Sequence, residues 1–297
     1  HIGQGDRQHI HHILRDRGLT PRQTLLAITL LCIAMATSAV LATIFQNDAE
    51  WLPEWIEFHE KQGVQHFYLY NNYSQDRYQE ILKPYVDKGL VEIIEWKKNS
   101  DSIVDFTLVQ CGAYQDCLKK ISGQAKWCAI IDTDEFLFAC DGRPLPLVLQ
   151  DYDRYSGVVV NWLCFGTSGV QKIPKNQKMI ETLLLRAPKN FDDNYFVKSI
   201  VKPADVQVCD CPHFCKLKAK KYCVTENKKL HGNSMRTKTV SVDILRINHY
   251  WARDLDFFYN IKIDRWIKWG KPYTNSIEKE AKMNAEYDDL ILQLADR

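Results

Sequence analysis

The chain has 297 residues, and its 39 Lys and Arg nearly balance its 37 Asp and Glu, which leaves a formal charge of +2. This balance argues against an electrostatic nucleic-acid binder, and we expect no nucleic acid as a partner. With 45% hydrophobic and 26% charged residues, the composition excludes a disordered or low-complexity chain. Ten cysteines are too few for a disulfide-built scaffold, so we expect a reducing compartment.

The first 45 residues differ in character from the rest, because a His-rich polar stretch is followed by an apolar run over residues 24–45. We therefore divide the chain into an N-terminal helical segment, residues 1–38, and a folded domain, residues 39–297. A membrane helix needs about 20 apolar residues, so a span would have to include residues 40–45. Those residues equally fit a buried strand before a helix. The chain does not begin with Met, and we expect a fragment or an internal start.

From residue 50 onward, helical and strand patterns alternate along the chain. A helix from about residue 50 is followed by a strand, a helix, a strand and a helix, and then by a strongly apolar strand that leads into four acidic or polar residues. The successive segments are residues 66–70, about 78–85, 91–96, about 105–120, 127–131 and 132–135. This order predicts an α/β fold with a mostly parallel sheet and a ligand site at the carboxyl ends of its strands.

The second half of the chain continues the pattern less regularly. Apolar runs predict further strands, and the two last segments predict closing helices. The strands are expected at residues 157–165, 196–201 and 240–247, and the helices at residues 254–269 and 277–294.

Asp132 and Asp134 stand one residue apart at the end of the apolar strand 127–131. Two carboxylates in this position can converge on a divalent cation that also binds phosphate oxygens. Apolar residues on both sides would make an uncompensated charge cluster costly. The alternative is an ordinary solvated polar loop. We favour the metal site, because the acidic pair follows a buried strand in a βαβα context.

Several extended stretches around this motif resemble glycosyltransferase family 92 and its family 2-like bacterial relatives over roughly residues 40–270. The matching stretches are residues 44–59, 63–72, 132–136, 160–162, 165–169, 197–200 and 246–250. The resemblance implies a GT-A fold and a nucleoside-diphosphate-sugar donor, for which we expect a UDP-sugar. It also implies a divalent cation, Mn²⁺ or Mg²⁺, bound through the acidic pair, and inversion at the anomeric carbon.

The same resemblance assigns donor binding to the loops after the first two strands, and so to Asn47, Glu50, Asn71 and Asp76, together with Asp132. Short Asn and Asp side chains at strand ends can bind ribose hydroxyls or a base edge, but they are also the usual turn formers and helix caps.

Two further positions come from the second half of the chain. His249 resembles an additional ligand of the metal or the diphosphate, and the alternative is a histidine satisfied within the core. Trp162 either stacks on a sugar face or belongs to the core.

Inverting transfer needs a group that accepts the proton of the acceptor hydroxyl, and we expect a carboxylate. The candidates follow the strand expected to face the acceptor, and they are Glu181, Asp192 and Asp193. Each of them could equally be a solvated surface acid. We favour Asp193 as the base.

Cys209, Cys211, His213 and Cys215 carry metal-ligating side chains, but their spacing is not a standard zinc spacing. A zinc site, a disulfide and free thiols all stay open, and His213 is also a candidate to line the acceptor cleft. The lysine-rich stretch at residues 216–229 is either a solvated loop or a contact for an anionic lipid or glycan.

Residues 5–14 and 17–23 resemble the cytoplasmic His-rich loop of polyprenyl-phosphate sugar-1-phosphate transferases, just ahead of a late membrane helix. Only about 38 residues match, and the other membrane helices of such an enzyme are missing, so we expect no phosphotransferase activity from this chain alone. If the segment is a true fusion, residues 24–45 would tether the domain at a membrane. We therefore expect a cytoplasmic location, with attachment to the cytoplasmic face of a membrane in the case of a fusion.

Taken together, these patterns predict a metal-dependent glycosyltransferase that acts on a glycan or lipid-linked acceptor. Two rival hypotheses remain. A phosphotransferase fragment would depend on His9, His11 and His12, and a degenerate sugar-binding module would bind the donor without turnover.

Overall fold

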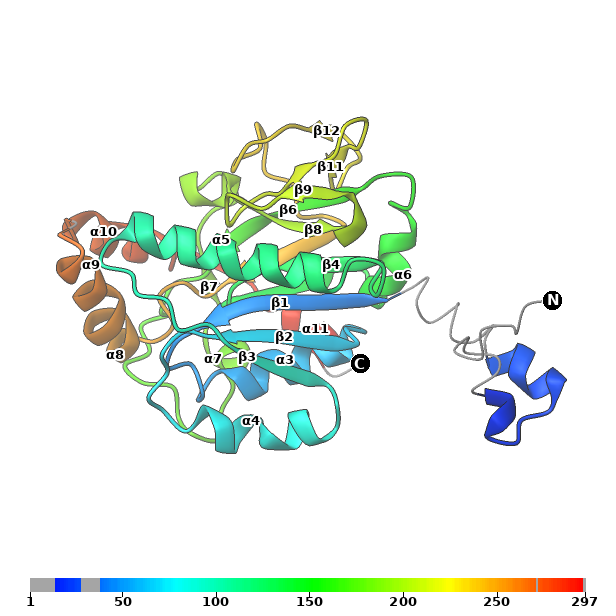
Figure 1. The fold of residues 1–297 in the computed structure, drawn as a ribbon. Coiled ribbons are helices and arrows are strands. Elements are labelled where there is room, and N and C mark those ends of the chain that lie inside the picture. Colours follow the sequence, from blue (N-terminus) through cyan, green and yellow to red (C-terminus); the bar gives the residue numbers. More distant parts are fainter. Residues whose placement is uncertain (1–13, 28–37, 271, 296–297) are drawn as a thin grey trace.

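A large mixed sheet forms the centre of the computed structural model, which describes residues 14–27, 38–270 and 272–295 (Figure 1). Its strand order is β12-β11-β6-β8-β4-β1-β2-β3. One half is entirely parallel, because β1 pairs in parallel with β2 and β4, and β2 pairs in parallel with β3. The bounds of these strands are Ala39–Phe45 for β1, His66–Asn71 for β2, Val91–Glu95 for β3 and Trp127–Ile130 for β4.

The other half of the sheet is mixed. β8 runs antiparallel to both β4 and β6, whereas β11 and β13 run parallel to β6, and β5 pairs antiparallel with β13. The bounds are Glu135–Ala139 for β5, Gly157–Cys164 for β6, Val197–Val201 for β8, Cys223–Thr225 for β11, Leu230–His231 for β12 and Leu245–His249 for β13. The expected α/β class with a mostly parallel sheet is confirmed.

Helices cover both faces of the sheet, because successive apolar side chains of β1 point to opposite faces. Val40, Ala42 and Ile44 pack into one apolar cluster with α5, whereas Leu41 and Phe45 pack into the opposite cluster with α3 and α4, as expected for successive side chains of a strand. Figure 1 shows α5 on one side of the sheet and α3 and α4 on the other. The helix bounds are Leu52–Lys61 for α3, Tyr78–Asp87 for α4, Ile103–Lys120 for α5 and Leu145–Gln150 for α6.

The C-terminal part differs from the sequence expectation at residues 277–294. Instead of one helix, α10 ends at Lys282, and the chain then pairs antiparallel with β7 before α11 begins. The backbone N–H of Ala285 donates to the Arg186 carbonyl, so pairing with a distant strand interrupts a segment with helical periodicity. The bounds are Met179–Thr182 for α7, Leu185–Arg186 for β7, Leu255–Phe257 for α8, Asp264–Lys268 for α9, Thr274–Lys282 for α10, Glu286–Tyr287 for β14 and Leu290–Ala295 for α11. A π-helical segment, Phe258–Ile263, joins α8 to α9.

Two short strands, β9 at Val206–Val208 and β10 at Lys216–Leu217, form a separate antiparallel pair beside the sheet. The cysteine- and histidine-containing loop joins them.

At the N-terminus, residues 14–16 and 21–27 include helical turns, and residues 39–45 form the buried strand β1. The strand alternative for residues 40–45 is therefore confirmed. Residues 1–13 and 28–37, which include most of the His-rich stretch and the middle of the apolar run, lie outside the described residues. Among the helices that are described, none combines the length and the apolar character that a membrane span requires.

The buried His59 links α3 to β5. Its Nδ1 donates to the Trp55 carbonyl at 2.8 Å, and its Nε2 accepts from the backbone N–H of Leu137 at 3.0 Å. Both contacts require the neutral ring, since a carbonyl can only accept and an N–H can only donate. Burial accordingly lowers the pKa of His59 to about 3.

This histidine predicts a loss of stability in acid. In the unfolded chain a histidine takes up a proton near pH 6.5, whereas the folded chain keeps His59 neutral down to about pH 3. Its contribution to stability is therefore complete above about pH 6.5 and is lost as the pH falls through that window, by up to about 1.4 kcal/mol per pH unit. The free energy of unfolding, measured with urea at pH 6, 5 and 4, should fall less steeply with decreasing pH for His59→Gln than for the unchanged chain. An equal pH dependence of stability in the two proteins would contradict the prediction, and His231→Gln, in the edge strand β12, is the control that should keep the original pH dependence.

Candidate active site

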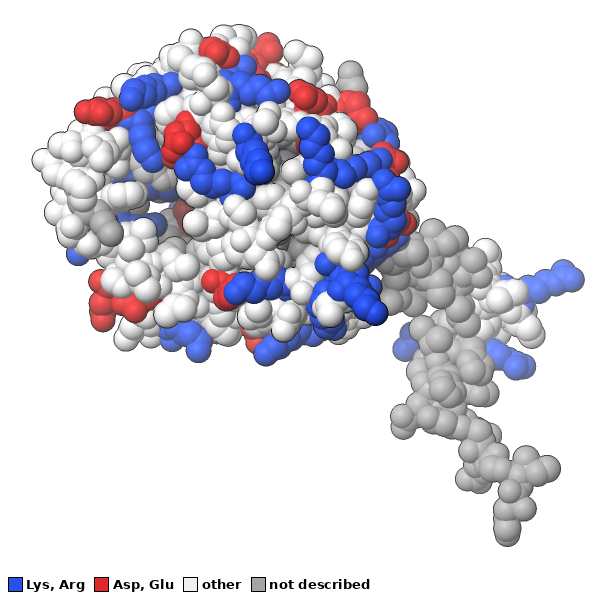
Figure 2. Space-filling view, turned by 90° about the horizontal axis from the view of Figure 1, so that it is seen from above, with Lys and Arg blue, Asp and Glu red and all other residues white. Residues whose placement is uncertain are grey.

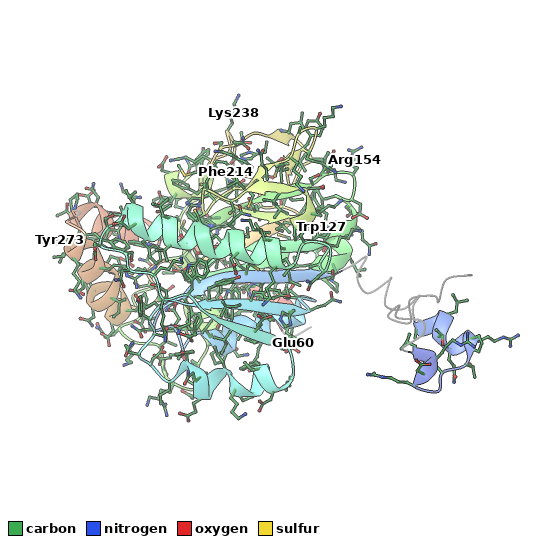
Figure 3. The ribbon with its side chains drawn as sticks, viewed as in Figure 1. Glu60, Trp127, Arg154, Phe214, Lys238 and Tyr273 are labelled. Carbon is green, nitrogen blue, oxygen red and sulfur yellow. The ribbon has the colours of Figure 1, made fainter. Side chains whose placement is uncertain are left out.

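Loops that follow three parallel strands converge at one end of the sheet. Since β1, β2 and β4 are parallel, the segments after Phe45, Asn71 and Ile130 meet at the same edge. β6 and β13 add Trp162 and His249 to this edge. In Figure 1 it lies on the left, where α8, α9 and α10 gather, and the surface in Figure 2 is hollowed toward the same end. In Figure 3, Trp127 at the start of β4 marks the opposite end of the sheet from Tyr273, which is next to α10.

The converging loops enclose an inner cavity of about 350 Å³. An outer hollow of about 420 Å³ shares part of its lining with this cavity, so the two form one groove. The shared lining residues are Gln46, Asn72, Phe106, Arg265 and Trp269. The combined space is in the range that binds a small molecule or cofactor.

Asp132 is held in place by three side chains. Its Oδ1 accepts from Gln110 Nε2 at 2.8 Å and from Tyr114 Oη at 3.0 Å, and its Oδ2 lies 2.8 Å from Lys198 Nζ. Gln110 and Tyr114 come from α5, and Lys198 comes from β8. The carboxylate that ends the β4 segment is therefore oriented by the helix above the sheet and by its antiparallel neighbour.

Lys198 also reaches the neighbouring Glu135, whose Oε1 lies 3.6 Å away. The Lys198 side chain is 1% exposed, and that of Glu135 is completely buried. Burial raises the pKa of Glu135 well above its usual range. Burial opposes the charge of Lys198 as well, but Asp132 and Glu135 raise the pKa of the ammonium above its ordinary value. The charged ammonium of Lys198 is thus held in a fixed position in the lining of the cavity.

Asp134 faces both a cation and an imidazole. Its Oδ2 accepts from Lys262 Nζ at 2.9 Å, and its Oδ1 lies 3.6 Å from His249 Nε2. Burial acts to raise the pKa of Asp134, but Lys262, His249 and Arg253 outweigh burial and hold the pKa below its usual range. The carboxylate is therefore ionised at neutral pH.

His249 is available as a ligand. Burial lowers its pKa to about 4, so the ring is neutral at pH 7. The nitrogen that faces Asp134 is Nε2, whereas Nδ1 is buried without a hydrogen-bond partner. A neutral imidazole is the form that binds metals. Two atoms that each lie about 2.1 Å from one cation are separated by about 3 to 4 Å, which matches the 3.6 Å between Asp134 Oδ1 and His249 Nε2. Within the described residues no cluster of three or more His, Cys, Asp and Glu side chains forms a complete cage, so a cation here would need ligands from a bound molecule or water.

Another ion pair, between Arg253 and Asp48, lies next to the Asp134 site. Arg253 Nη1 donates to Asp48 Oδ1 at 2.8 Å, and Arg253 Nη2 donates to Thr133 Oγ1 at 3.2 Å. Thr133 in turn donates to Asp48 Oδ2 at 3.0 Å. Arg253 is buried in the left-handed backbone region, with φ of 51°, a conformation that costs a non-glycine residue free energy unless the surroundings compensate. This network joins the loops after β1, β4 and β13.

The sequence model of glycosyltransferase family 92 matches residues 39–291 of this chain. The chain belongs to glycosyltransferase family 92. Curated relatives carry the same family name. A family 92 protein of Oryza sativa subsp. japonica is 30% identical over 176 residues, which cover 57% of this chain and 27% of that protein. One of Ricinus communis is 25% identical over 169 residues, which cover 55% of this chain and 28% of that protein. The match thus takes in less than a third of the length of these family 92 relatives.

Solved structures resemble this family 92 chain more distantly. The crystal structure of S. aureus TarS 1–349 has 12% sequence identity and a TM-score of 0.38, and the match covers 63% of this chain and 60% of that chain. The crystal structure of HddC from Yersinia pseudotuberculosis has 13% identity and a TM-score of 0.34, with 65% of this chain and 92% of that chain covered.

The structure brings together Asp132, Asp134, His249 and Trp162, all of which the sequence of this family 92 member singled out. Trp162 is 8% exposed and its ring centroid lies 4.3 Å from that of His249. Its Nε1 is buried without a partner, so Trp162 both packs in the core and lines the cavity.

The predicted nucleoside residues lie mostly beside the groove rather than in it. Asn47 Oδ1 accepts from the backbone N–H of Gln75, Asn71 Nδ2 donates to Glu95, and Asp76 Oδ2 accepts from the backbone N–H of Ala49. These side chains shape the two loops, and Glu50 is exposed outside the groove lining. Donor contact by Asn47, Glu50, Asn71 and Asp76 stays a prediction. The groove lining instead includes the adjacent residues Gln46, Asp48, Asn72 and Tyr73.

The three candidate bases do not line the groove. Asp193 is paired with Lys279 of α10 at 2.9 Å, Asp192 with Arg236, and Glu181 lies on α7 near Lys178. The side chains of Asp192 and Glu181 are 74% and 50% exposed, as expected for surface acids. The structure therefore supplies no contact between these carboxylates and the cavity.

Sequence reasoning missed the cations of the site. Lys198, Lys262, Arg253 and Arg265 all line the inner cavity, and burial lowers the pKa of Arg265 although Asp48 favours its charged form. Lys262 and Arg265 come from the π-helical segment and α9, which cover the carboxyl edge of the sheet. Their only sequence signal was a basic, aromatic-rich helical segment near the C-terminus.

The loop with Cys209, Cys211 and Cys215 contains free cysteines, and no disulfide or metal cluster involves them in the described part of the chain. His213, from the same loop, does line the inner cavity. In the lysine-rich stretch, Lys216 pairs with Asp210 and Lys221 with Asp205. Figure 2 shows blue Lys and Arg side chains spread across the middle of the surface that is seen from above. Binding of an anionic partner there stays a prediction.

Proposed function

We propose that this chain is a glycosyltransferase that moves a sugar from a nucleoside diphosphate donor, with a UDP-sugar as the first choice, to an acceptor hydroxyl. The observation that carries the proposal is the pair Asp134 and His249, facing each other across 3.6 Å inside a groove lined by basic side chains. Membership of family 92 supports the same class of reaction.

The ligating atoms that Asp134 and His249 offer fit a divalent cation, Mn²⁺ or Mg²⁺. Asp134 and His249 would hold it, and Asp132, oriented by Lys198, would contact the donor or the cation's bound water. When bound, the cation offsets the negative charge that develops on the departing diphosphate. Lys262 and Arg265 lie on the covering segment and add positive charge at the same place.

Direct displacement with inversion is the mechanism that we propose. Three carboxylates line the inner cavity within the described residues, and each is paired with a cation: Asp48 with Arg253, Asp132 with Lys198 and Asp134 with Lys262. A carboxylate held in this way is a poor nucleophile at the anomeric carbon, which supports a single step in which the acceptor oxygen attacks directly.

For the acceptor we propose a glycan or a lipid-linked glycan. Trp251, Trp266 and Phe257 line the inner cavity, and aromatic rings offer apolar faces against which sugar C–H groups pack. Attachment at the cytoplasmic face of a membrane is proposed with it, on the resemblance of the N-terminal segment alone.

Chelation of divalent cations is expected to abolish transfer by the full chain. Release of nucleoside diphosphate from a panel of nucleotide sugars should rise at least about tenfold with Mn²⁺ or Mg²⁺ over EDTA, because the cation supplies several kcal/mol to the transition state. Soluble oligosaccharides and polyprenyl-linked sugars serve as two acceptor arms. Donor binding without turnover under all conditions would identify a degenerate binding module, and turnover that is indifferent to EDTA would overturn the metal site.

A further inference from the structure

His213 is a cavity residue that the mechanism so far does not use. It lies in the loop between β9 and β10, and its ring centroid is 5.3 Å from Trp162 and 5.2 Å from Phe196. Figure 3 labels the next residue, Phe214, above α5. The two aromatic contacts hold the imidazole against the wall of the inner cavity.

One hydrogen bond determines the tautomer of this ring. His213 Nδ1 lies 3.1 Å from the Val197 carbonyl, and because a carbonyl oxygen only accepts, Nδ1 carries the hydrogen. In the neutral ring Nε2 then holds an unshared electron pair. Nε2 has no hydrogen-bond partner among the described residues and is not one of the buried atoms without a partner, so it is accessible from the groove.

The other groups of the inner cavity that could accept a proton already have charged partners or face the proposed cation site. Asp48, Asp132 and Asp134 are each paired with a cation, and His249 faces Asp134 at the proposed cation site. The carboxylates expected from the sequence to act as base lie outside the groove lining. Among the described residues that line the inner cavity, His213 is thus the basic group that neither forms an ion pair nor faces the proposed cation site.

We propose that His213 is the general base of the transfer reaction, an inference that rests on the proposed function. Nε2 takes the proton of the acceptor hydroxyl as the acceptor oxygen forms its bond to the anomeric carbon. The bond from that carbon to the phosphate oxygen breaks at the same time, and its electron pair leaves with the nucleoside diphosphate. The imidazolium afterwards returns the proton to water.

The surroundings of His213 keep it neutral at working pH. Burial lowers its pKa to about 4, with Lys198 and His249 acting in the same direction and Asp132 acting against them. A base of this strength is comparable to the carboxylate that the sequence led us to expect. Packing between two aromatic rings and the bond to Val197 fix the direction of its lone pair.

The test is His213→Asn in the full chain, because an Asn amide can keep the bond to the Val197 carbonyl and lacks Nε2. We expect kcat for transfer to fall by about 10²- to 10³-fold, the usual contribution of a general base. The KM for the donor and the affinity for UDP with Mn²⁺ should stay within about threefold, because the proposed donor contacts are untouched. A kcat within about threefold of the unchanged chain would overturn the proposal.

Chemical rescue separates a base from a packing residue. In His213→Ala, added imidazole should restore kcat at least about tenfold, whereas a merely structural role would give no recovery. His231→Gln, in β12 and outside the groove lining, is the matched control and should keep full activity. If the unchanged chain transfers no sugar from any donor, the proposed function itself fails; if it does and His213→Asn transfers equally well, only the assignment of the base fails.

Discussion

Replacing Asp134 by Asn is expected to lower kcat/KM for sugar transfer by about a thousandfold. The carboxylate is ionised, because Lys262, His249 and Arg253 hold its pKa low despite burial, and it is the charged member of the proposed cation pair. Loss of about 4 kcal/mol of transition-state stabilisation corresponds to this factor. Steady-state kinetics over a Mn²⁺ titration measure it, and the concentration of Mn²⁺ needed for half-maximal binding of UDP should rise as well.

Asp87→Asn provides the control for this substitution. Asp87 makes an exposed ion pair with Lys83 on α4, so the same chemical change there should leave kcat/KM unaltered. Equal activity of Asp134→Asn and Asp87→Asn would contradict the role of Asp134. A lost activity that excess Mn²⁺ does not alter, together with unchanged Mn²⁺ affinity, would point to a structural role instead.

Replacing Lys198 by Met is expected to lower the free energy of unfolding by about 3 kcal/mol. Met fills a similar volume but removes the cation that lies 2.8 Å from Asp132 and 3.6 Å from the buried Glu135. Removing one partner of a buried ion pair leaves uncompensated charge and costs about 3 to 5 kcal/mol. The lower end applies because the Asp132 side chain is 32% exposed. Urea unfolding followed by circular dichroism measures the change.

Lys83→Met is the matched control for the stability experiment. Lys83 and Asp87 are 69% and 59% exposed, and such a helical pair contributes only about 0.3 to 0.5 kcal/mol. A loss of less than about 1 kcal/mol for Lys198→Met would show that Asp132 tolerates the absence of this cation. That outcome would contradict the account of Lys198 as the counter-ion of Asp132.

Asp132 and Asp193 show which site positions could be predicted from the sequence and which could not. Asp132 follows an apolar strand, and the carboxyl end of a parallel strand is where open α/β sheets bind ligands, so its position followed from local pattern. Asp193 was chosen as an acid near a later strand, but in the structure it lies outside the groove lining and pairs with Lys279 of α10. No local pattern reports such a long-range partner.

The nucleoside loops show a similar limit at closer range. Asn47 and Asp76 were singled out as polar residues at strand ends, and these two side chains instead bond to backbone N–H groups across the loops. Their neighbours Gln46 and Asn72 line the groove. Short Asn and Asp side chains serve equally well as turn formers and as ligand contacts, so composition alone could not separate the two uses.

By itself, the sequence determined the alternating elements of the parallel half, the acidic pair after β4 and the likeness to family 92, because periodicity and strand–loop order are local properties of the chain. Only the tertiary structure decided which cations and which further histidine line the same cavity as that pair. Lys198 arrives on an antiparallel strand, Lys262 on a covering helical segment and His213 on a loop between two short strands. Their separation along the chain carries no periodic signal, since these contacts form only when the packed sheet and its covering segments bring distant residues to one edge.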